Sequence, residues 1–348
     1  MSQTIPQIQW VMLDDSYSDE ILDLVVSIEK EDGAPYRSAL NEVKSFFSDV
    51  WMTRAIGGRT SDGVLIAFGL VRMPRVHGEY VEISLWGGIR PDYRNFGFGR
   101  ELVGMQVRAA REMASDGVAQ RASIVMHVDE GHDDLADLLK RDGFEYLSLY
   151  AQMRRKLDKT IETPVPPPFI SFVNLTEDLD PQVRAVHNAI DLENSQGSGV
   201  TEEQWISERS YMNREWSFVA LDTLGDRPRL AGYIISGKYE QDWNARGWSE
   251  GYIDEVAVYD EVRRFQLLRS LIAQAMISYQ NDGIEYAGID VPYQENQENN
   301  DMDFFKNLGF EVVGRTYVFS KEIDIQSTPV RNVVHAHSRW RLFRSSGS

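Results

Sequence analysis

The stretch YRNFGFGREL, residues 93–102, decides which fold and function this chain is expected to have. An arginine, Arg94, precedes two glycines, Gly97 and Gly99, and an amphipathic segment follows over residues 98–115. Glycine lets a backbone approach a ligand closely because it has no Cβ. The first turn of a helix attracts phosphate through its unpaired N–H groups and partial positive charge. Taken alone, the pattern indicates either a phosphate-binding loop or a tight strand-to-helix turn that needs glycine.

A second stretch, VRRFQLLRSL at residues 262–271, has the same outline without the glycines. Arg263 matches the arginine of the first stretch, whereas Gln266 and Leu268 stand where the first stretch has glycine. We therefore expect side chains to occupy the phosphate space of this second copy, which would keep the fold and lose the ligand.

Another pair of similar segments indicates an internal duplication. LLKRDGFEYL (residues 138–147) resembles FFKNLGFEVV (residues 304–313), with Gly143 matching Gly309 at an offset of 166 residues. The arginine pair has an offset of 169 residues. Two independent segments at nearly one offset predict two copies of one domain.

A proline-rich segment separates the two copies. Four of the 12 prolines fall within ETPVPPPF, residues 162–169, and such a segment is stiff, extended and unsuited to a packed sheet. The predicted division is a first domain at 1–160, a linker at 161–168, a second domain at 169–323 and a basic tail at 324–348.

The apolar periodicity predicts an α+β fold with two tandem domains, each a mixed, mostly antiparallel sheet flanked by helices. In the first copy the expected strands are residues 8–13, 63–73, 79–89, 122–128 and 145–157, and the expected helices are residues 18–30, 38–51, 98–115 and 133–141. The second copy is expected to repeat this order from residue 170 to residue 323.

These pieces together resemble the GNAT superfamily of N-acyltransferases. The resemblance is carried by the I-x-P at residues 89–91, the R-x-x-G-x-G at 94–99 and the Gly-Phe at 143–144, and it covers residues 8–157 and 169–323. A dinucleotide-binding reading of the glycines fails on position, because that motif opens a βαβ unit and this loop follows several antiparallel strands.

The resemblance implies acetyl-CoA as the acyl donor, bound by the glycine loop and by backbone N–H groups of the preceding strand. Two adjacent glycines, Gly87 and Gly88, suit a bulge or a close backbone approach there. The residues assigned to the donor are Gly88, Ile89, Arg90, Arg94, Asn95, Phe96, Gly97, Phe98, Gly99 and Arg100.

For the proton on the attacking amine, the family often uses a glutamate six residues before the first residue of V-x-P. That position is Ile83, and Glu82 lies one residue earlier. A one-residue bulge at the two glycines would restore the register; otherwise Glu82 is a solvent-facing strand carboxylate. Glu79 is a weaker candidate. His132, near the expected position of the CoA arm, is the second catalytic candidate.

The leaving thiolate has no assigned acid. The family often places a tyrosine four residues before the Gly-Phe pair, and Leu139 and Phe305 occupy those positions. A thiol with a pKa near ~8.5 also leaves as an anion, so turnover is still expected.

The acceptor site is assigned to the segment that covers it in the family. Glu29, Glu31 and Asp32 fall in that loop, and Trp86 on the strand completes the set. The carboxylates would hold a cationic substrate, although a charged loop is more often only solvated.

Composition sets further limits. The net charge is −18 and cysteine is absent, which excludes disulfides, thiolate metal sites and a cysteine nucleophile. An acidic surface disfavours nucleic acid and anionic membranes, and favours a cationic small molecule or serves solubility alone. No apolar run approaches a membrane span of ~18–20 residues, and no signal peptide is recognised. We expect a cytoplasmic monomer or homodimer without a metal.

The resemblance therefore implies an enzyme that transfers acetyl from acetyl-CoA to a primary amine of a small, cationic molecule. Transfer would be direct, in a ternary complex, with the chemistry in the first domain. The alternatives are a catalytically silent acyl-CoA sensor and an acetyltransferase of protein N-termini or lysines.

Overall fold

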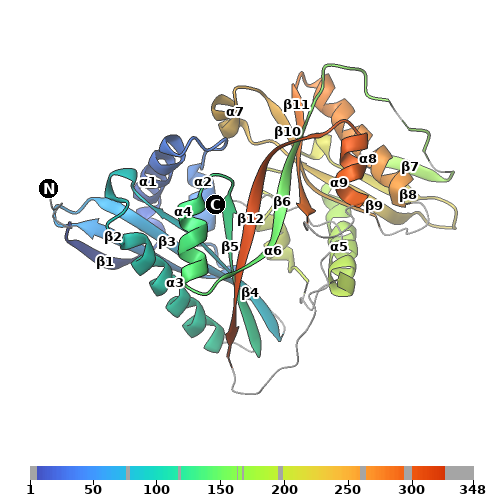
Figure 1. Ribbon diagram of the computed structural model, residues 1–348. Coiled ribbons are helices and arrows are strands. Elements are labelled where there is room, and N and C mark those ends of the chain that lie inside the picture. Colours follow the sequence, from blue (N-terminus) through green and yellow to red (C-terminus); the bar gives the residue numbers. More distant parts are fainter. Residues whose placement is uncertain are drawn as a thin grey trace. The chain divides into compact units, whose positions relative to one another are not determined.

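The computed structural model describes residues 6–75, 79–116, 119–162, 164–166, 168–194, 199–258, 264–293 and 300–325. The chain forms two compact units. Within the described residues, unit 1 contains residues 6–147 and 317–325, and unit 2 contains residues 148–316. Figure 1 labels the helices and strands of both units.

Unit 1 is a mixed sheet in the order β1-β2-β3-β4-β5-β12 with helices on both faces. Its elements are β1 (Ile8–Leu13), α1 (Ser18–Glu31), α2 (Leu40–Ser45), β2 (Trp51–Thr60), β3 (Leu65–Pro74), β4 (Tyr80–Ile89), α3 (Phe98–Ser115), β5 (Arg121–Asp129), α4 (Asp133–Arg141) and the end of β12 (Glu311–Asp324), with short 3₁₀ turns at Asp15–Tyr17 and Pro91–Tyr93.

Alternation along β4 assigns the two faces of this sheet. Val81, Ile83 and Leu85 pack in one core with apolar residues of α3. Trp86 points the other way, into a core formed with α1 and the residues around α2. Figure 1 shows α1 and α3 on opposite faces of the strands.

The pairing of β4 with β5 ends part of the way along both strands. The two strands are parallel and paired from Tyr80–Arg121 to Leu85–Met126. Beyond that point β4 continues along β3 alone, with Gly88 opposite Phe68 and Ile89 opposite Ala67. The two strands therefore separate at the end where the glycine loop follows β4.

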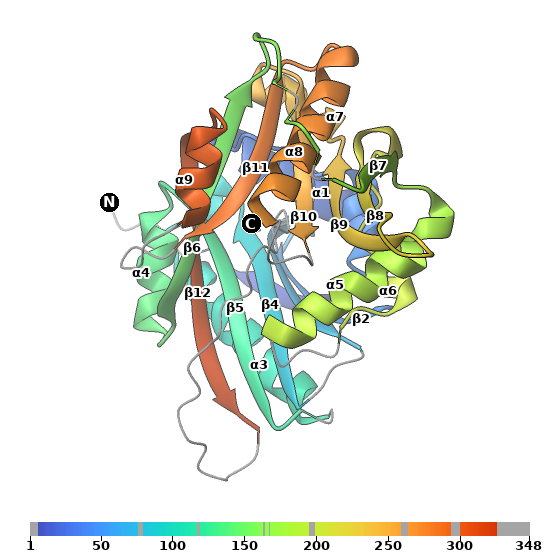
Figure 2. The ribbon, with the colours of Figure 1, turned by 90° about the vertical axis from the view of Figure 1, so that its right-hand side faces the viewer.

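Unit 2 repeats this plan with the strand order β6-β11-β10-β9-β8-β7. Its elements are β6 (Glu145–Lys156), β7 (Ile170–Asn174), α5 (Asp180–Asn194), α6 (Glu202–Ser207), β8 (Phe218–Asp222), β9 (Arg229–Gly237), α7 (Glu240–Arg246), β10 (Glu250–Val258), α8 (Arg264–Asn281), β11 (Tyr286–Tyr293) and α9 (Asn300–Asn307), with 3₁₀ turns at Glu177–Leu179 and Arg214–Trp216. Figure 2 shows α5 and α8 on opposite sides of the strands of this unit.

Each unit contains a strand from the other half of the sequence. Strand β6 belongs to unit 2 from Ser148 onward, and β12 belongs to unit 1 from Tyr317 onward. Phe319 and Ile323 of β12 are buried in the core that α3 covers, and Met153 of β6 is buried in the core of unit 2. The sequence halves and the packed units are therefore different divisions of the chain.

The expected fold class is confirmed: each unit is a mixed sheet flanked by helices. The predicted helix at 38–51 is wrong in length, because α2 ends at Ser45 and β2 begins at Trp51. Strand β2 was not predicted, since Gly57 and Gly58 interrupt its apolar pattern. A Cβ at either glycine would lie about 3 Å or less from a neighbouring side chain, such as Leu13 or Ala67.

Candidate active site

The glycine loop of unit 1 presents a run of unpaired backbone donors. Asn95 and Gly97 have positive φ angles of 67° and 92°, and Gly97 is the N-cap of α3. Within the described part of the chain, the N–H groups of residues 95–99 donate no hydrogen bond, whereas Arg100 N–H already bonds the Gly97 carbonyl. Five successive free N–H groups at the start of a helix form an anion-binding arrangement.

The space over this loop is open. A Cβ built on Gly97 would meet nothing within 4 Å, and one on Gly99 would make only ordinary contacts with Leu138 and Ile89. Gly97 is thus required for its backbone angle, and room for a ligand remains above it. Phe98 is buried beneath the loop, while Asn95 is exposed.

Arg94 is paired with Asp32, a carboxylate that the sequence analysis places in the acceptor site. Its Nη1 and Nη2 lie 2.6 and 2.8 Å from the two carboxylate oxygens of Asp32, and its Nε donates to the Ile89 carbonyl at 3.2 Å. The hydrogen bond to Asp32 raises the pKa of Arg94 above its usual value. The guanidinium therefore ties the glycine loop to the segment after α1.

That segment, residues 32–39, has two further anchors. Glu29 is buried and accepts hydrogen bonds from the Ser38 N–H and hydroxyl. Burial raises the pKa of Glu29, and the bonds from Ser38 oppose that shift. The Tyr36 hydroxyl donates to Asp129, at the end of β5, over 2.9 Å. Glu29 and Asp32 thus have partners within unit 1, and Glu31 is exposed to solvent.

The end of β4 has an unusual backbone. Gly87 has a φ of 152°, and a Cβ there would lie 2.2 Å from the Phe68 carbonyl oxygen, so only glycine fits. The buried amide of Gln106 in α3 donates to the Trp86 carbonyl at 2.8 Å. The C=O and N–H of a trans peptide point in opposite directions. The Gly87 N–H therefore points away from α3, toward the face that α1 covers.

Glu82 lies on that same face but far from the two glycines. The register of β3 with β4 runs without a shift from Ser84 to Ile89, so the bulge that would bring Glu82 into the family position is absent. Gly87 is five positions after Glu82, which is ~17 Å along a strand. Glu82 is exposed, and Ile83, at the family position, is fully buried in the opposite core.

Three further candidates, Trp86, Arg100 and Arg90, have structural positions of different kinds. Trp86 is buried and stacks edge-on against Phe46 and Phe68 at centroid distances of 5.0 and 5.3 Å, so it fills the core. Arg100 is largely exposed and lies 3.7 Å from Asp142. The Arg90 N–H bonds the Ile66 carbonyl and ends the β4 ladder.

His132 is the N-cap of α4, and its carbonyl accepts from Leu135 and Ala136. A different histidine, His127, lies on β5 one residue beyond the last pair with β4. Burial lowers the pKa of the His127 imidazole, and the charge of Asp129 acts against that shift. Leu139, where the family often has its tyrosine, is fully buried.

The described part of the second copy has a helix where the first copy has its glycine loop. Arg263 lies outside the described residues, and α8 is helical from Arg264, so the counterparts of residues 95–97 are part of a helix. Gln266 is exposed and donates to the Val165 carbonyl at 3.1 Å. Leu268 is buried in the core. The expectation that Leu268 occupies a phosphate space is therefore wrong, because its side chain points inward.

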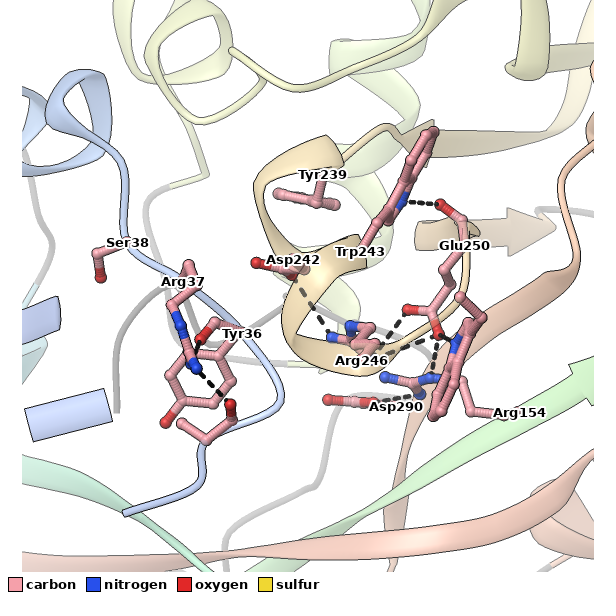
Figure 3. A network of polar contacts seen from close by, with 12 residues as sticks. Tyr36, Arg37, Ser38, Arg154, Tyr239, Asp242, Trp243, Arg246, Glu250 and Asp290 are labelled. Carbon is pink, nitrogen blue, oxygen red and sulfur yellow. Dashed lines mark hydrogen bonds and ion pairs between the residues drawn. The ribbon is translucent and has the colours of Figure 1, made fainter. Parts of the chain in front are cut away.

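Unit 2 instead buries a network of charged side chains (Figure 3). Arg154 contacts Glu250 at 2.5 Å and Asp290 at 3.4 Å, and Arg246 contacts Glu250 at 3.2 Å and Asp242 at 3.5 Å. Several carboxylates of unit 2 are thus internal and paired with arginine, which lowers their cost of burial.

No group of three or more His, Cys, Asp or Glu side chains that would hold a metal ion occurs in the described ranges. Among those residues, none of the helices has both the length and the apolar character needed to cross a membrane.

Solved structures share this fold. A GCN5-related N-acetyltransferase from Sphaerobacter thermophilus is 18% identical, with a TM-score of 0.66 over 92% of this chain and 97% of that one. A tandem GNAT protein from the clavulanic acid biosynthesis pathway is 14% identical, with a TM-score of 0.64 over 93% and 100%. Saccharomyces cerevisiae N-myristoyltransferase is 12% identical, with a TM-score of 0.57 over 92% and 80%.

No family model matches the chain, and no curated protein sequence matches it. At these identities the solved structures establish the fold, and the resemblance of the sequence to the GNAT superfamily is confirmed at that level. The chain has a tandem GNAT fold.

Proposed function

We propose that this protein is an acyl-CoA-dependent N-acyltransferase whose donor site lies in unit 1. The observation that carries the proposal is the run of five unpaired N–H groups at residues 95–99, under open space at the start of α3. Oriented N–H groups and the helix dipole suit the pyrophosphate of CoA. The fold shared with solved N-acetyltransferases supports the same reading.

The separation of β4 and β5 supports binding of the acyl arm of CoA between the ends of these two strands. A thioester lying beside the end of β4 would meet the Gly87 N–H, which points away from α3 as Gln106 holds the preceding carbonyl. A backbone N–H there would stabilise the oxyanion of the tetrahedral intermediate. Arg94, whose charge is matched by Asp32, positions the loop and is not assigned to the phosphates.

We infer a small primary amine as acceptor and acetyl as the acyl group. A cationic acceptor is favoured by Glu82, Asp129 and Glu31 around the face that α1 covers, because carboxylates concentrate cations. Attack is direct, since the sequence contains no cysteine to form a thioester with the enzyme.

The test offers acetyl-CoA with spermidine, glucosamine, tyramine and an amine-terminated peptide, and follows free CoA together with the mass of the product. We expect release of CoA that depends on one of the small amines. Binding of acetyl-CoA without acylation of any amine would favour a sensor, and acylation of the peptide alone would favour a protein acetyltransferase.

A further inference from the structure

We propose that His127 on β5 is the general base of unit 1, in place of Glu82 and His132; this rests on the proposed function. The parallel pairs of β4 and β5 advance in step, Glu82 with Ser123 and Leu85 with Met126. Continuing this register by one residue, past the last pair, brings His127 level with Trp86. We therefore place His127 across from the Trp86–Gly87 peptide, at the point where the strands part.

The face of β5 on which His127 lies is the face of the acceptor. Ile124, Met126 and Val128 are buried in the core that α3 covers. Since side chains alternate along a strand, His127 and Asp129 lie on the opposite face. The bond from Tyr36 to Asp129 confirms that this face looks toward the segment after α1.

Distance separates His127 from the other candidates. Glu82 is level with Ser123, four residues down the strand from His127, which is ~13 Å. His132 lies beyond the end of β5, where its backbone caps α4. In the described part of unit 1, His127 is the titratable side chain nearest in register to the Gly87 N–H.

The chemistry balances with a neutral imidazole. The substrate ammonium gives one proton to His127, and the free amine attacks the thioester carbonyl carbon. The tetrahedral intermediate collapses with cleavage of the C–S bond, and the electron pair leaves on sulfur. The second nitrogen proton goes to the thiolate, and the imidazolium returns its proton to water. Burial lowers the pKa of the His127 imidazole and so favours the neutral form, which is a proton acceptor.

The charged and titratable groups on this face set the pH dependence. Asp129 is the nearest, and its charge opposes the shift. Tyr36 faces the same end of β5, while the other groups lie lower on the face: Glu82, Tyr80, Arg121 and, on β12, Glu322. The rate should rise with pH through the pKa of His127, below the usual histidine range.

The first experiment needs no known acceptor. The chain has six histidines, and their imidazole carbon-bound protons are followed by NMR in the full-length protein with and without acetyl-CoA, His127→Gln giving the assignment. Acetyl-CoA should move the His127 signal and its titration, and leave His187, buried beside Glu255 in unit 2, unchanged. Bound acetyl-CoA with an unmoved His127 signal overturns the inference. Failure of acetyl-CoA to bind overturns the proposed function and with it the inference.

The second experiment uses whichever amine of the panel is turned over. His127→Gln should lower kcat at least about a hundredfold, the usual size of a general-base effect, and abolish the acidic limb of the pH profile. The dissociation constant of acetyl-CoA should stay within about threefold, a difference below ~0.7 kcal/mol. His132→Gln is the matched control and should keep the limb. A His127→Gln enzyme with an unchanged pH profile contradicts the inference.

Discussion

At the scale of single residues, the Asp32–Arg94 ion pair changes the role of the arginine in the R-x-x-G-x-G motif. The sequence suggested Arg94 as a phosphate ligand and Asp32 as a substrate ligand. The structure places them in one bidentate ion pair, with Arg94 Nε also bound to the Ile89 carbonyl. Their charges largely cancel beside the open loop, so in the proposed function the backbone N–H groups would hold the CoA pyrophosphate.

Replacing Asp32 tests whether its charge cancels that of Arg94 at the loop. Asp32→Asn keeps a hydrogen-bond acceptor for Arg94 and removes a negative charge near the loop, so acetyl-CoA should bind more tightly. An exposed charge interaction of ~0.2–1 kcal/mol corresponds to a gain of up to about fivefold. Calorimetry at low salt and at high salt measures the gain, which screening should reduce. Tenfold weaker binding would mean that the pair matters chiefly for holding the loop.

His127 shows what could be predicted at this scale and what could not. The alternation in ASIVMHVDE, residues 122–130, puts His127 and Asp129 on the polar face of a strand, and this was readable from the sequence. The residue at which β4 and β5 separate could not be predicted, because it depends on pairing between segments far apart in the chain. For the same reason the hydrogen bond from Gln106 to the Trp86 carbonyl was not predicted.

At the scale of elements, β10 differs from its counterpart β4 by a bulge. The register of β10 with β9 shifts between Ile253 and Glu255, which leaves Asp254 as the extra residue. Its carboxylate accepts from the Tyr239 hydroxyl at 2.7 Å. Burial raises the pKa of Asp254 to about 7, against the hydrogen bond from Tyr239 and the charge of Arg209.

The raised pKa of Asp254 in the folded state determines how the stability of the protein changes with pH. The native state binds the Asp254 proton more tightly than the unfolded chain, so this group costs stability as the pH rises from about 4 to about 7. Asp254→Asn removes the titration and keeps an acceptor for Tyr239. Its stability relative to the wild type should increase by about 2–3 kcal/mol between pH 5 and pH 8. Urea unfolding of both proteins at each pH measures this difference, and a constant difference would contradict the shift.

The helices illustrate the limits of motif matching. The predicted range of α3, 98–115, is the observed one, because its apolar spacing and preceding glycines are local signals. The match of Arg263 with Arg94 predicts that the second copy has lost the glycine loop. The start of α8 at Arg264 was not predicted. Without glycine, nothing prevents the helix from starting early.

At the scale of the whole molecule, the two units are interdependent through their strands. The core of unit 1 includes Phe319 and Ile323 from the last strand of the chain. The core of unit 2 includes Ala151 and Met153, which precede the proline-rich segment. The duplication and the fold were predictable from repeated local motifs. The exchange of strands was not, because both copies have the same pattern and either strand fits either sheet.

The most direct test of the central claim is the affinity of acetyl-CoA for three variants, measured by calorimetry. Gly97→Gln alters the loop; Gly63→Gln is the matched control, because Gly63 has a similar φ of 89° and equally open surroundings in the turn between β2 and β3. Gln266→Ala probes the second copy, and Leu268 is spared because it is buried.

We predict one acetyl-CoA per chain, with affinity about a hundredfold weaker in Gly97→Gln, as expected for loss of two charge-assisted hydrogen bonds of ~1.5 kcal/mol each. Gly63→Gln and Gln266→Ala should bind as the wild type does, and circular dichroism should show all three folded. Retained binding in Gly97→Gln, or binding lost in Gln266→Ala alone, would contradict the assignment of the acyl-CoA site to unit 1.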